Sequence, residues 1–212
     1  MLAVLLAAAV AAATPQGNEL LGLWESVRTD NGVGSTLEFR ADATYVQATA
    51  VLVDLRYRLV GDRLVTAENP PGEKADAAGS PRVRIDGGVM LLTGPDGSVV
   101  RKERVGSAQP DAPPIVGVWR YRHSTGATAF ERYASDGTVS LRVPLSSTVG
   151  VYVLNRPELT LVQAGRSAVK ASVELAGGEL VVSGPGLRTT TYRRAAAGPW
   201  YDREHIDVRP PR

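Results

Sequence analysis

The feature that most limits how this chain can fold is an internal repeat. The segment Leu21–Trp24 (LGLW) recurs 95 residues later as Val116–Trp119 (VGVW). Two further collinear matches pair Phe39–Thr44 with Tyr133–Thr138 and Ile85–Leu91 with Leu175–Val181. The offset falls from 95 to 90 along the repeat, which places a deletion in the second copy opposite the segment Asn69–Ser80. Matches in one order with one loop-sized gap indicate two diverged copies of the same structural unit.

Within each copy, short runs rich in Val, Thr, Leu and Tyr alternate with turn residues, which is the pattern of β-strands. The pairs Asn31-Gly32, Asp96-Gly97 and Asp136-Gly137 are typical of tight hairpins, because they accept positive φ angles. The predicted strands are 21–28, 35–40, 44–50, 54–60, 63–67, 82–86, 89–93 and 98–104 in the first copy, and 116–122, 127–133, 138–143, 149–154, 157–163, 169–175, 179–183 and 187–194 in the second.

Tight turns between consecutive strands predict antiparallel neighbours, since parallel pairing needs long crossover connections. A meander of eight strands removes both of its exposed edges when it closes on itself. The predicted fold class is therefore all-β, with two tandem antiparallel eight-stranded meander barrels or strongly curled sheets.

The domain division follows the repeat. We expect a signal peptide at 1–13, repeat 1 at 19–107, a Pro-rich linker at 108–114, repeat 2 at 115–195 and a polar tail at 196–212. The signal assignment rests on an apolar run that ends in three alanines before a polar Thr-Pro-Gln-Gly, with cleavage expected near Thr14. The run is too short to span a bilayer, so no transmembrane segment is expected, and we expect export to the periplasm or the extracellular space.

Composition limits the classes of function. The chain has no cysteine, which excludes thiolate metal sites and thiol catalysis. Its net charge is +2, but its basic residues are scattered singly and its aromatic content is 6%. A nucleic-acid interface would concentrate basic residues with stacking aromatics, so no nucleic-acid partner is expected.

The Gly-x-Trp at the head of each copy, followed by eight strands, resembles the lipocalin-like (calycin-type) small β-barrels. In that family the indole sits at the closed end of the barrel and packs against a basic residue of the last strand. The resemblance implies structural roles for Trp24 and Trp119. Within each repeat, it pairs Trp24 with Arg101 or Arg104, and Trp119 with Arg193 or Arg194. A less favoured alternative makes the two tryptophans part of a binding site.

Four tyrosines are candidate ligand-binding residues if they point inward. Tyr57 and Tyr152 are equivalent in the two repeats, and the other two are Tyr45 and Tyr133. A buried phenol needs a hydrogen-bond partner, which a ligand or the protein core can provide. A core role is the favoured alternative for all four.

No catalytic or metal signature stands out. His123 and His205 are the only histidines, and although acids flank His205, the chain offers too few ligands for a zinc site there. Asp42 and Asp136 occupy equivalent turn positions, where aspartate serves turn geometry. We expect no catalytic residues, no metal and no cofactor.

These observations predict an exported, non-catalytic, lipocalin-like protein that binds a small apolar ligand. Short strands enclose little space, so the ligand should be compact and should enter opposite the Gly-x-Trp end. One alternative is an envelope or extracellular interaction or inhibitor protein that acts through its loops, with an unidentified protein partner. The other is an uncharacterised enzyme or a haem-binding barrel.

Overall fold

The computed structural model describes residues 19–67 and 77–195, and these form 14 strands. The expected signal peptide, the polar tail with His205 and most of the loop 69–80 lie outside the described residues. Within the described ranges there is no helix of the length and apolarity that crossing a membrane requires. The strands are β1 (Gly22–Ser26), β2 (Val33–Phe39), β3 (Thr44–Val60), β4 (Arg63–Ala67), β5 (Arg82–Asp86), β6 (Val89–Thr93), β7 (Val99–Val105), β8 (Gly117–Arg122), β9 (Thr128–Tyr133), β10 (Thr138–Asn155), β11 (Glu158–Gln163), β12 (Val169–Ala176), β13 (Glu179–Gly184) and β14 (Leu187–Arg194).

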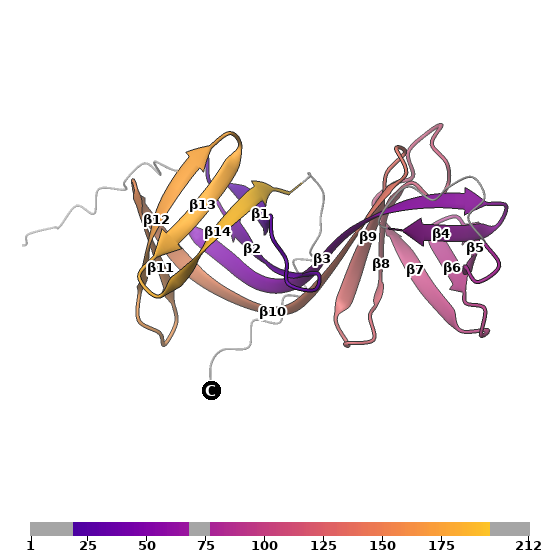
Figure 1. Ribbon diagram of the computed structural model, residues 1–212, viewed down its shortest axis with the longest axis horizontal. Coiled ribbons are helices and arrows are strands. Elements are labelled where there is room, and N and C mark those ends of the chain that lie inside the picture. Colours follow the sequence, from indigo (N-terminus) through magenta and orange to yellow (C-terminus); the bar gives the residue numbers. More distant parts are fainter. Residues whose placement is uncertain (1–18, 68–76, 196–212) are drawn as a thin grey trace, which may run out of the picture.

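All described strands pair antiparallel in one sheet that closes into a ring, with each strand beside its sequence neighbours and β1 beside β14. A further pairing joins β3 to β10 across the ring, from Arg56 opposite Thr138 to Thr44 opposite Val151. These two strands are far longer than the others and run side by side through the middle of the molecule (Figure 1). The ring is thereby divided into two lobes.

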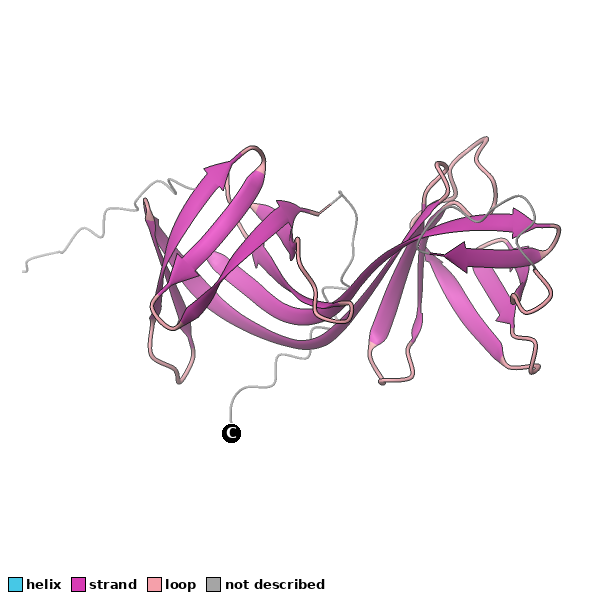
Figure 2. Ribbon diagram, in the orientation of Figure 1, coloured by secondary structure: helices cyan, strands magenta, loops and turns pink. Residues whose placement is uncertain are grey.

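Each lobe contains strands from both repeats (Figure 1), and in both lobes the strands are joined by loops (Figure 2). Lobe 1, defined as residues 19–51 and 143–195, combines β1, β2 and the first half of β3 with the second half of β10 and β11–β14. Lobe 2, residues 52–142, combines the second half of β3 and β4–β7 with β8, β9 and the first half of β10. The expected antiparallel all-β class is confirmed, but the expectation of two separate barrels, one for each repeat, is wrong.

The expected turn between strands 44–50 and 54–60 is absent. The intervening residues Val51, Leu52 and Val53 are apolar and mostly β-branched, which favours an extended strand and provides no turn chemistry. The chain therefore continues as β3, a strand of 17 residues and about 55 Å. The equivalent break in the second repeat, between 138–143 and 149–154, is also absent, and β10 instead carries a bulge at Pro144.

Each lobe has its own hydrophobic core. The core of lobe 1 is built around Trp24, Phe39, Tyr45, Leu159 and Leu180, and so draws on both repeats. The core of lobe 2 is built around Leu64, Met90, Ile115, Trp119 and Tyr133, again from both repeats. Neither repeat alone contains a complete core of either lobe. The two repeats are therefore combined in the side-chain packing as well as in the sheet.

An ion-pair network lies where the crossing strands meet lobe 1. The guanidinium of Arg142 on β10 donates two hydrogen bonds to Glu25 on β1, at 2.8 and 2.9 Å, and both side chains are buried. Arg142 also contacts Asp54 on β3 at 2.9 Å, and Asp54 contacts Arg193 on β14 at 2.7 Å. Burial by itself lowers the pKa of Arg142, but the two carboxylates outweigh it and raise the pKa overall. The network ties β1 and β14 to both crossing strands.

Candidate functional site

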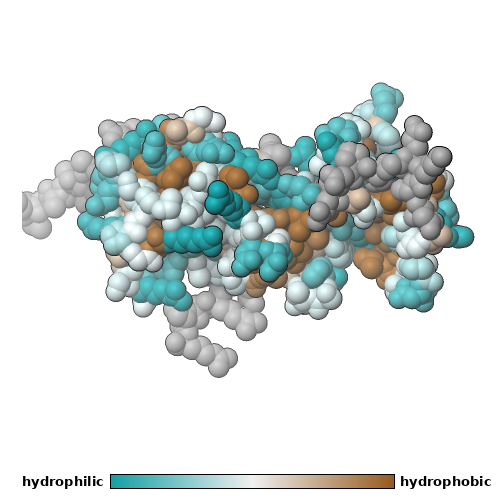
Figure 3. Space-filling model, in the orientation of Figure 1, coloured by the Kyte–Doolittle hydropathy of each residue, from teal (hydrophilic) through white to brown (hydrophobic). Residues whose placement is uncertain are grey.

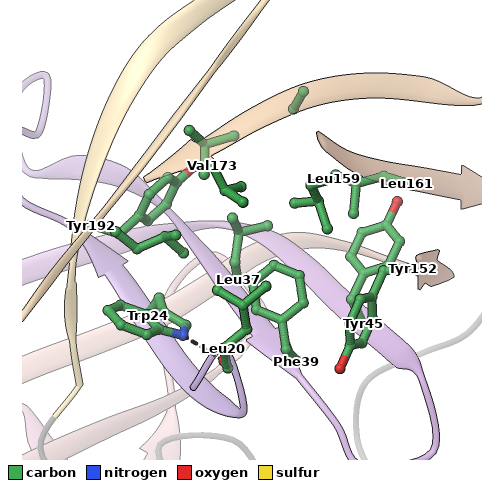
Figure 4. Packing of buried hydrophobic residues seen from close by; sticks show 13 residues of the cluster. Leu20, Trp24, Leu37, Phe39, Tyr45, Tyr152, Leu159, Leu161, Val173 and Tyr192 are labelled. Atoms are coloured by element: carbon green, nitrogen blue, oxygen red, sulfur yellow. Dashed lines mark hydrogen bonds between the residues drawn. The ribbon is translucent and has the colours of Figure 1, made fainter. Parts of the chain in front are cut away.

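Each lobe is closed at one end by the indole of its Gly-x-Trp motif. Trp24 and Trp119 are 1% and 0% exposed. The ring nitrogen of Trp24 donates to the carbonyl of Leu20 at 2.7 Å (Figure 4). Trp119 repeats this with Ile115 at 2.8 Å. Both indoles are thus fully packed and have a satisfied polar atom, so they belong to the core.

The arginine that packs on each indole comes from the other repeat. Arg194 lies 4.3 Å from the ring centre of Trp24, and Arg104 lies 4.2 Å from that of Trp119. The last strand of each repeat supplies the expected type of residue, but the predicted pairing within repeats is wrong. The pairing differs from the expected one because each lobe combines strands of both repeats, with β14 beside β1 and β7 beside β8.

The glycine of each motif makes room for that arginine. Gly22 and Gly117 have φ angles of 112° and 136°, a region that other residues rarely adopt. A Cβ atom at Gly22 would lie 2.9 Å from Arg194, and one at Gly117 would lie 2.5 Å from Arg104. The guanidinium of Arg104 also donates to the carbonyls of Val116, at 2.8 Å, and Pro114. The glycine, the indole and the arginine therefore form one closure at the end of each lobe.

The tyrosine equivalents Tyr57 and Tyr152 hold turns of the opposite repeat. The hydroxyl of Tyr57 donates to the carbonyl of Ala134 at 2.8 Å, and that of Tyr152 donates to the carbonyl of Arg40 at 3.2 Å. Their rings pack edge-on against Tyr133 and Phe39, with ring centres 5.0 Å apart in each case. These contacts favour the core role over the ligand role for Tyr57 and Tyr152.

A cavity of about 370 Å³ lies in lobe 1, at the end opposite Trp24. Its buried floor consists of the inward-facing side chains Leu37, Tyr45, Leu161, Val182 and Tyr192. Exposed residues form its mouth, namely Gln47, Arg166, Ser167, Val169, Leu187 and Arg188. Of the four tyrosines predicted from the sequence, Tyr45 lines this cavity. Tyr152 belongs to the same core cluster as Tyr45 (Figure 4), whereas Tyr57 and Tyr133 belong to lobe 2.

The cavity offers apolar contact together with a few polar groups. Burial raises the pKa of Tyr45, with a hydrogen bond to Gln163 and the charge of Arg166 opposing it, and burial also raises the pKa of Tyr192. Both phenols are therefore protonated at neutral pH and serve as hydrogen-bonding groups. The hydroxyl of Tyr192 lies 3.1 Å from the Ser35 hydroxyl across the cavity wall.

The corresponding region of lobe 2 is occupied by an ion pair. Glu131 is the lobe 2 equivalent of Leu37, because Glu131 lies opposite Trp119 and Leu37 lies opposite Trp24. Lys102 is likewise the equivalent of Tyr192, because the two lie opposite the equivalent residues Met90 and Leu180. Lys102 forms a buried ion pair with Glu131, and its ammonium group lies 4.5 Å from the ring centre of Tyr121. Burial lowers the pKa of Lys102, and the neighbouring Glu131 opposes that shift. The two lobes thus share a fold but differ in the chemistry of their interiors.

The remaining sequence candidates lie in turns. Asp42 accepts hydrogen bonds from the backbone and the hydroxyl of Thr44, and Asp136 accepts one from the backbone of Thr138 at 2.9 Å. Those bonds lower the pKa of both aspartates. His123 is half-buried and contacts Thr125 at 3.0 Å. Among the residues that the structure places, no three His, Asp or Glu side chains gather as a metal site would require.

Sequence reasoning missed the polar rim of the cavity, Gln47, Gln163, Arg166 and Arg188. The available signal was strand alternation: Tyr45 and Gln47, like Leu161 and Gln163, are two apart and so face the same side. Arg188 follows the same alternation with Thr190 and Tyr192 on β14, whereas Arg166 lies in a turn, where the sequence pattern does not set direction. Comparisons of the chain with protein families, with curated proteins and with solved structures give no match.

Proposed function

We propose that this protein is an exported, non-catalytic binding protein that holds a compact, largely apolar molecule in the cavity of lobe 1. The observation that carries the proposal is the cavity itself. It is closed towards Trp24, has an apolar floor and opens through exposed residues. Its volume of about 370 Å³ is at the lower end of the range typical of small-molecule sites.

The similarity of the Gly-x-Trp closure to lipocalin-like barrels supports this function, because such barrels use the end opposite the indole for ligands. The arrangement of polar groups supports it further. Tyr45 and Tyr192 provide fixed hydroxyls in an otherwise apolar floor, which is how small-molecule sites orient a ligand. The proposed location outside the cytoplasm rests on the apolar N-terminal run alone.

The test is titration of the full chain with a neutral fluorescent hydrophobic probe, N-phenyl-1-naphthylamine. We expect saturable binding with one site per chain. Thr190 lines the cavity, so Thr190→Phe should fill it and abolish binding. The adjacent, exposed Thr189 faces the opposite side of β14, so Thr189→Phe is the matched control and should bind as the unmodified protein does.

Absence of saturable binding would contradict the proposal and favour an interaction protein. The surface in Figure 3 is mostly polar, with hydrophobic residues in separate patches on both lobes. On the outer face of lobe 1, Val151 on β10 lies opposite Val162 on β11, and Val153 follows two residues along β10. These valines are 36–52% exposed and would be the first surface to test for a protein partner.

A further inference from the structure

We infer that the ligand of the lobe 1 cavity is an amphiphile with an anionic head group, which Arg166 and Arg188 hold at the mouth. The inference rests on the proposed binding function and specifies the ligand class. An apolar chain would occupy the floor formed by Leu37, Leu161 and Val182, with the head group at the solvent end.

The two arginines line the mouth and come from different elements. Arg166 lies in the turn between β11 and β12, and Arg188 lies near the start of β14. The guanidinium of Arg166 is close enough to Tyr45 to act on the pKa of its phenol. Two guanidinium groups at one opening suit the binding of a carboxylate or a phosphate, because each guanidinium presents several hydrogen-bond donors in a planar array.

No acidic side chain described by the structure offsets this charge. None of the described residues that line the cavity carries a carboxylate, and no described acid forms an ion pair with either arginine. The neighbouring polar groups, Gln47, Gln163 and Ser167, are uncharged. The mouth therefore favours an anion over a neutral or a cationic head group.

The mouth also carries apolar side chains that suit the upper part of a hydrocarbon chain. Val169 and Leu187 line the cavity and are 41% and 39% exposed. These apolar residues lie beside the two arginines. The junction between the ligand's hydrocarbon chain and its head group is therefore expected at the level of β12 and β14. The small volume limits the chain to a short or medium length.

The experiment uses three probes that share a chain and differ in the head group: decanoate, decanol and decylamine. Each displaces N-phenyl-1-naphthylamine from the full-length protein at low ionic strength. We expect decanoate to bind roughly tenfold or more tightly than decanol, and decylamine to bind most weakly, because charge-assisted hydrogen bonds contribute on that order. The preference should shrink as salt is added, since the mouth is exposed to solvent.

The variant Arg166→Gln/Arg188→Gln should lose the preference for decanoate over decanol. The control Arg84→Gln/Arg122→Gln removes two exposed charges from lobe 2 and should keep the preference. Equal affinity for decanoate and decanol in the unmodified protein, or an undiminished preference in the cavity variant, would overturn the inference and leave the proposed function in place. Failure of all three probes and of the neutral dye would overturn both.

Discussion

Trp24 and Trp119 each have two partners: a backbone carbonyl at the ring nitrogen and a guanidinium on the ring face. The carbonyl lies four residues earlier in the chain, whereas the guanidinium comes from the other repeat. A cation over an indole face contributes about 0.5–2 kcal/mol, depending on burial. The cross-repeat contact is therefore large enough to measure by mutation.

A double-mutant cycle tests which arginine serves which indole. For Trp24→Leu with Arg194→Met, the coupling free energy should be about 0.5–2 kcal/mol in chemical unfolding. For Trp24→Leu with Arg104→Met, it should be zero within about 0.5 kcal/mol, because the two side chains lie in different lobes. The reverse pattern would show that each repeat closes on itself in solution.

The buried ion pair of lobe 2 leads to a second prediction. Lys102→Met leaves Glu131 buried without its cation, which should cost about 3–5 kcal/mol of unfolding free energy. The double variant Lys102→Tyr/Glu131→Leu installs the residues that lobe 1 has at these positions and should cost clearly less, because no unpaired charge remains. Urea unfolding at neutral pH measures both. A double variant as unstable as the single one would mean that the pair contributes specific favourable energy.

Among the elements, β3 and β10 determine the arrangement of the rest. Each passes from one lobe into the other, and each pairs with different neighbours in its two halves. The second half of β10 contains Gly150, which lies opposite Tyr45 on β3 and Gln163 on β11. Its lack of a side chain allows the phenol of Tyr45 to approach the strand and line the cavity.

Gly150→Ala should therefore destabilise lobe 1 and alter its cavity. The new Cβ atom would lie 2.6 Å from the Tyr45 ring and in collision with the carbonyl of Val162. Overpacking of this kind costs about 1–3 kcal/mol, and the displaced ring should weaken probe binding. Gly79→Ala is the control, since its Cβ would meet nothing within 4 Å, and its change should stay within about 0.5 kcal/mol. Equal stability of the two variants would mean that β10 can shift away from Tyr45.

In the whole molecule, lobe 2 is continuous in sequence and is inserted into lobe 1, which is made of two separate segments of the chain. Lobe 2 uses one stretch of chain, 52–142, whereas lobe 1 is made from the stretches on either side of it. The linker segment 108–114 joins β7 to β8, which pair with each other inside lobe 2. The segment between the two repeats is therefore a loop within one lobe.

This arrangement predicts which fragments fold. Residues 52–142 contain every strand of lobe 2 and the Trp119–Arg104 contact, so this fragment should show β-type circular dichroism and a cooperative thermal transition. Residues 19–107 retain Trp24 but lack Arg194 and β10, so they should show no cooperative transition as a monomer. If 19–107 melts cooperatively and 52–142 does not, the repeats are the folding units.

Local sequence determined the strand class and the turns, and it marked the start of each closure with a Gly-x-Trp motif. The alternation of residues, the Asn-Gly and Asp-Gly pairs and the Gly-x-Trp motifs act over a few neighbours, so their consequences are readable without a structure. Most predicted strand positions are confirmed for that reason. The expected core position of the two tryptophans agrees with their burial.

The choice of partners was decided only by the tertiary structure. Arg104 and Arg194 end equivalent strands, so either can meet Trp24 as far as local pattern is concerned. The deciding residues, Val51, Leu52 and Val53, extend β3 past the place where a hairpin would have closed the first repeat on itself. β3 and β10 continue without a turn and pair with each other. Each half of a repeat then lies beside a half of the other copy and buries its apolar face against it. The cavity follows from the same packing, since its walls come from strands more than a hundred residues apart in sequence.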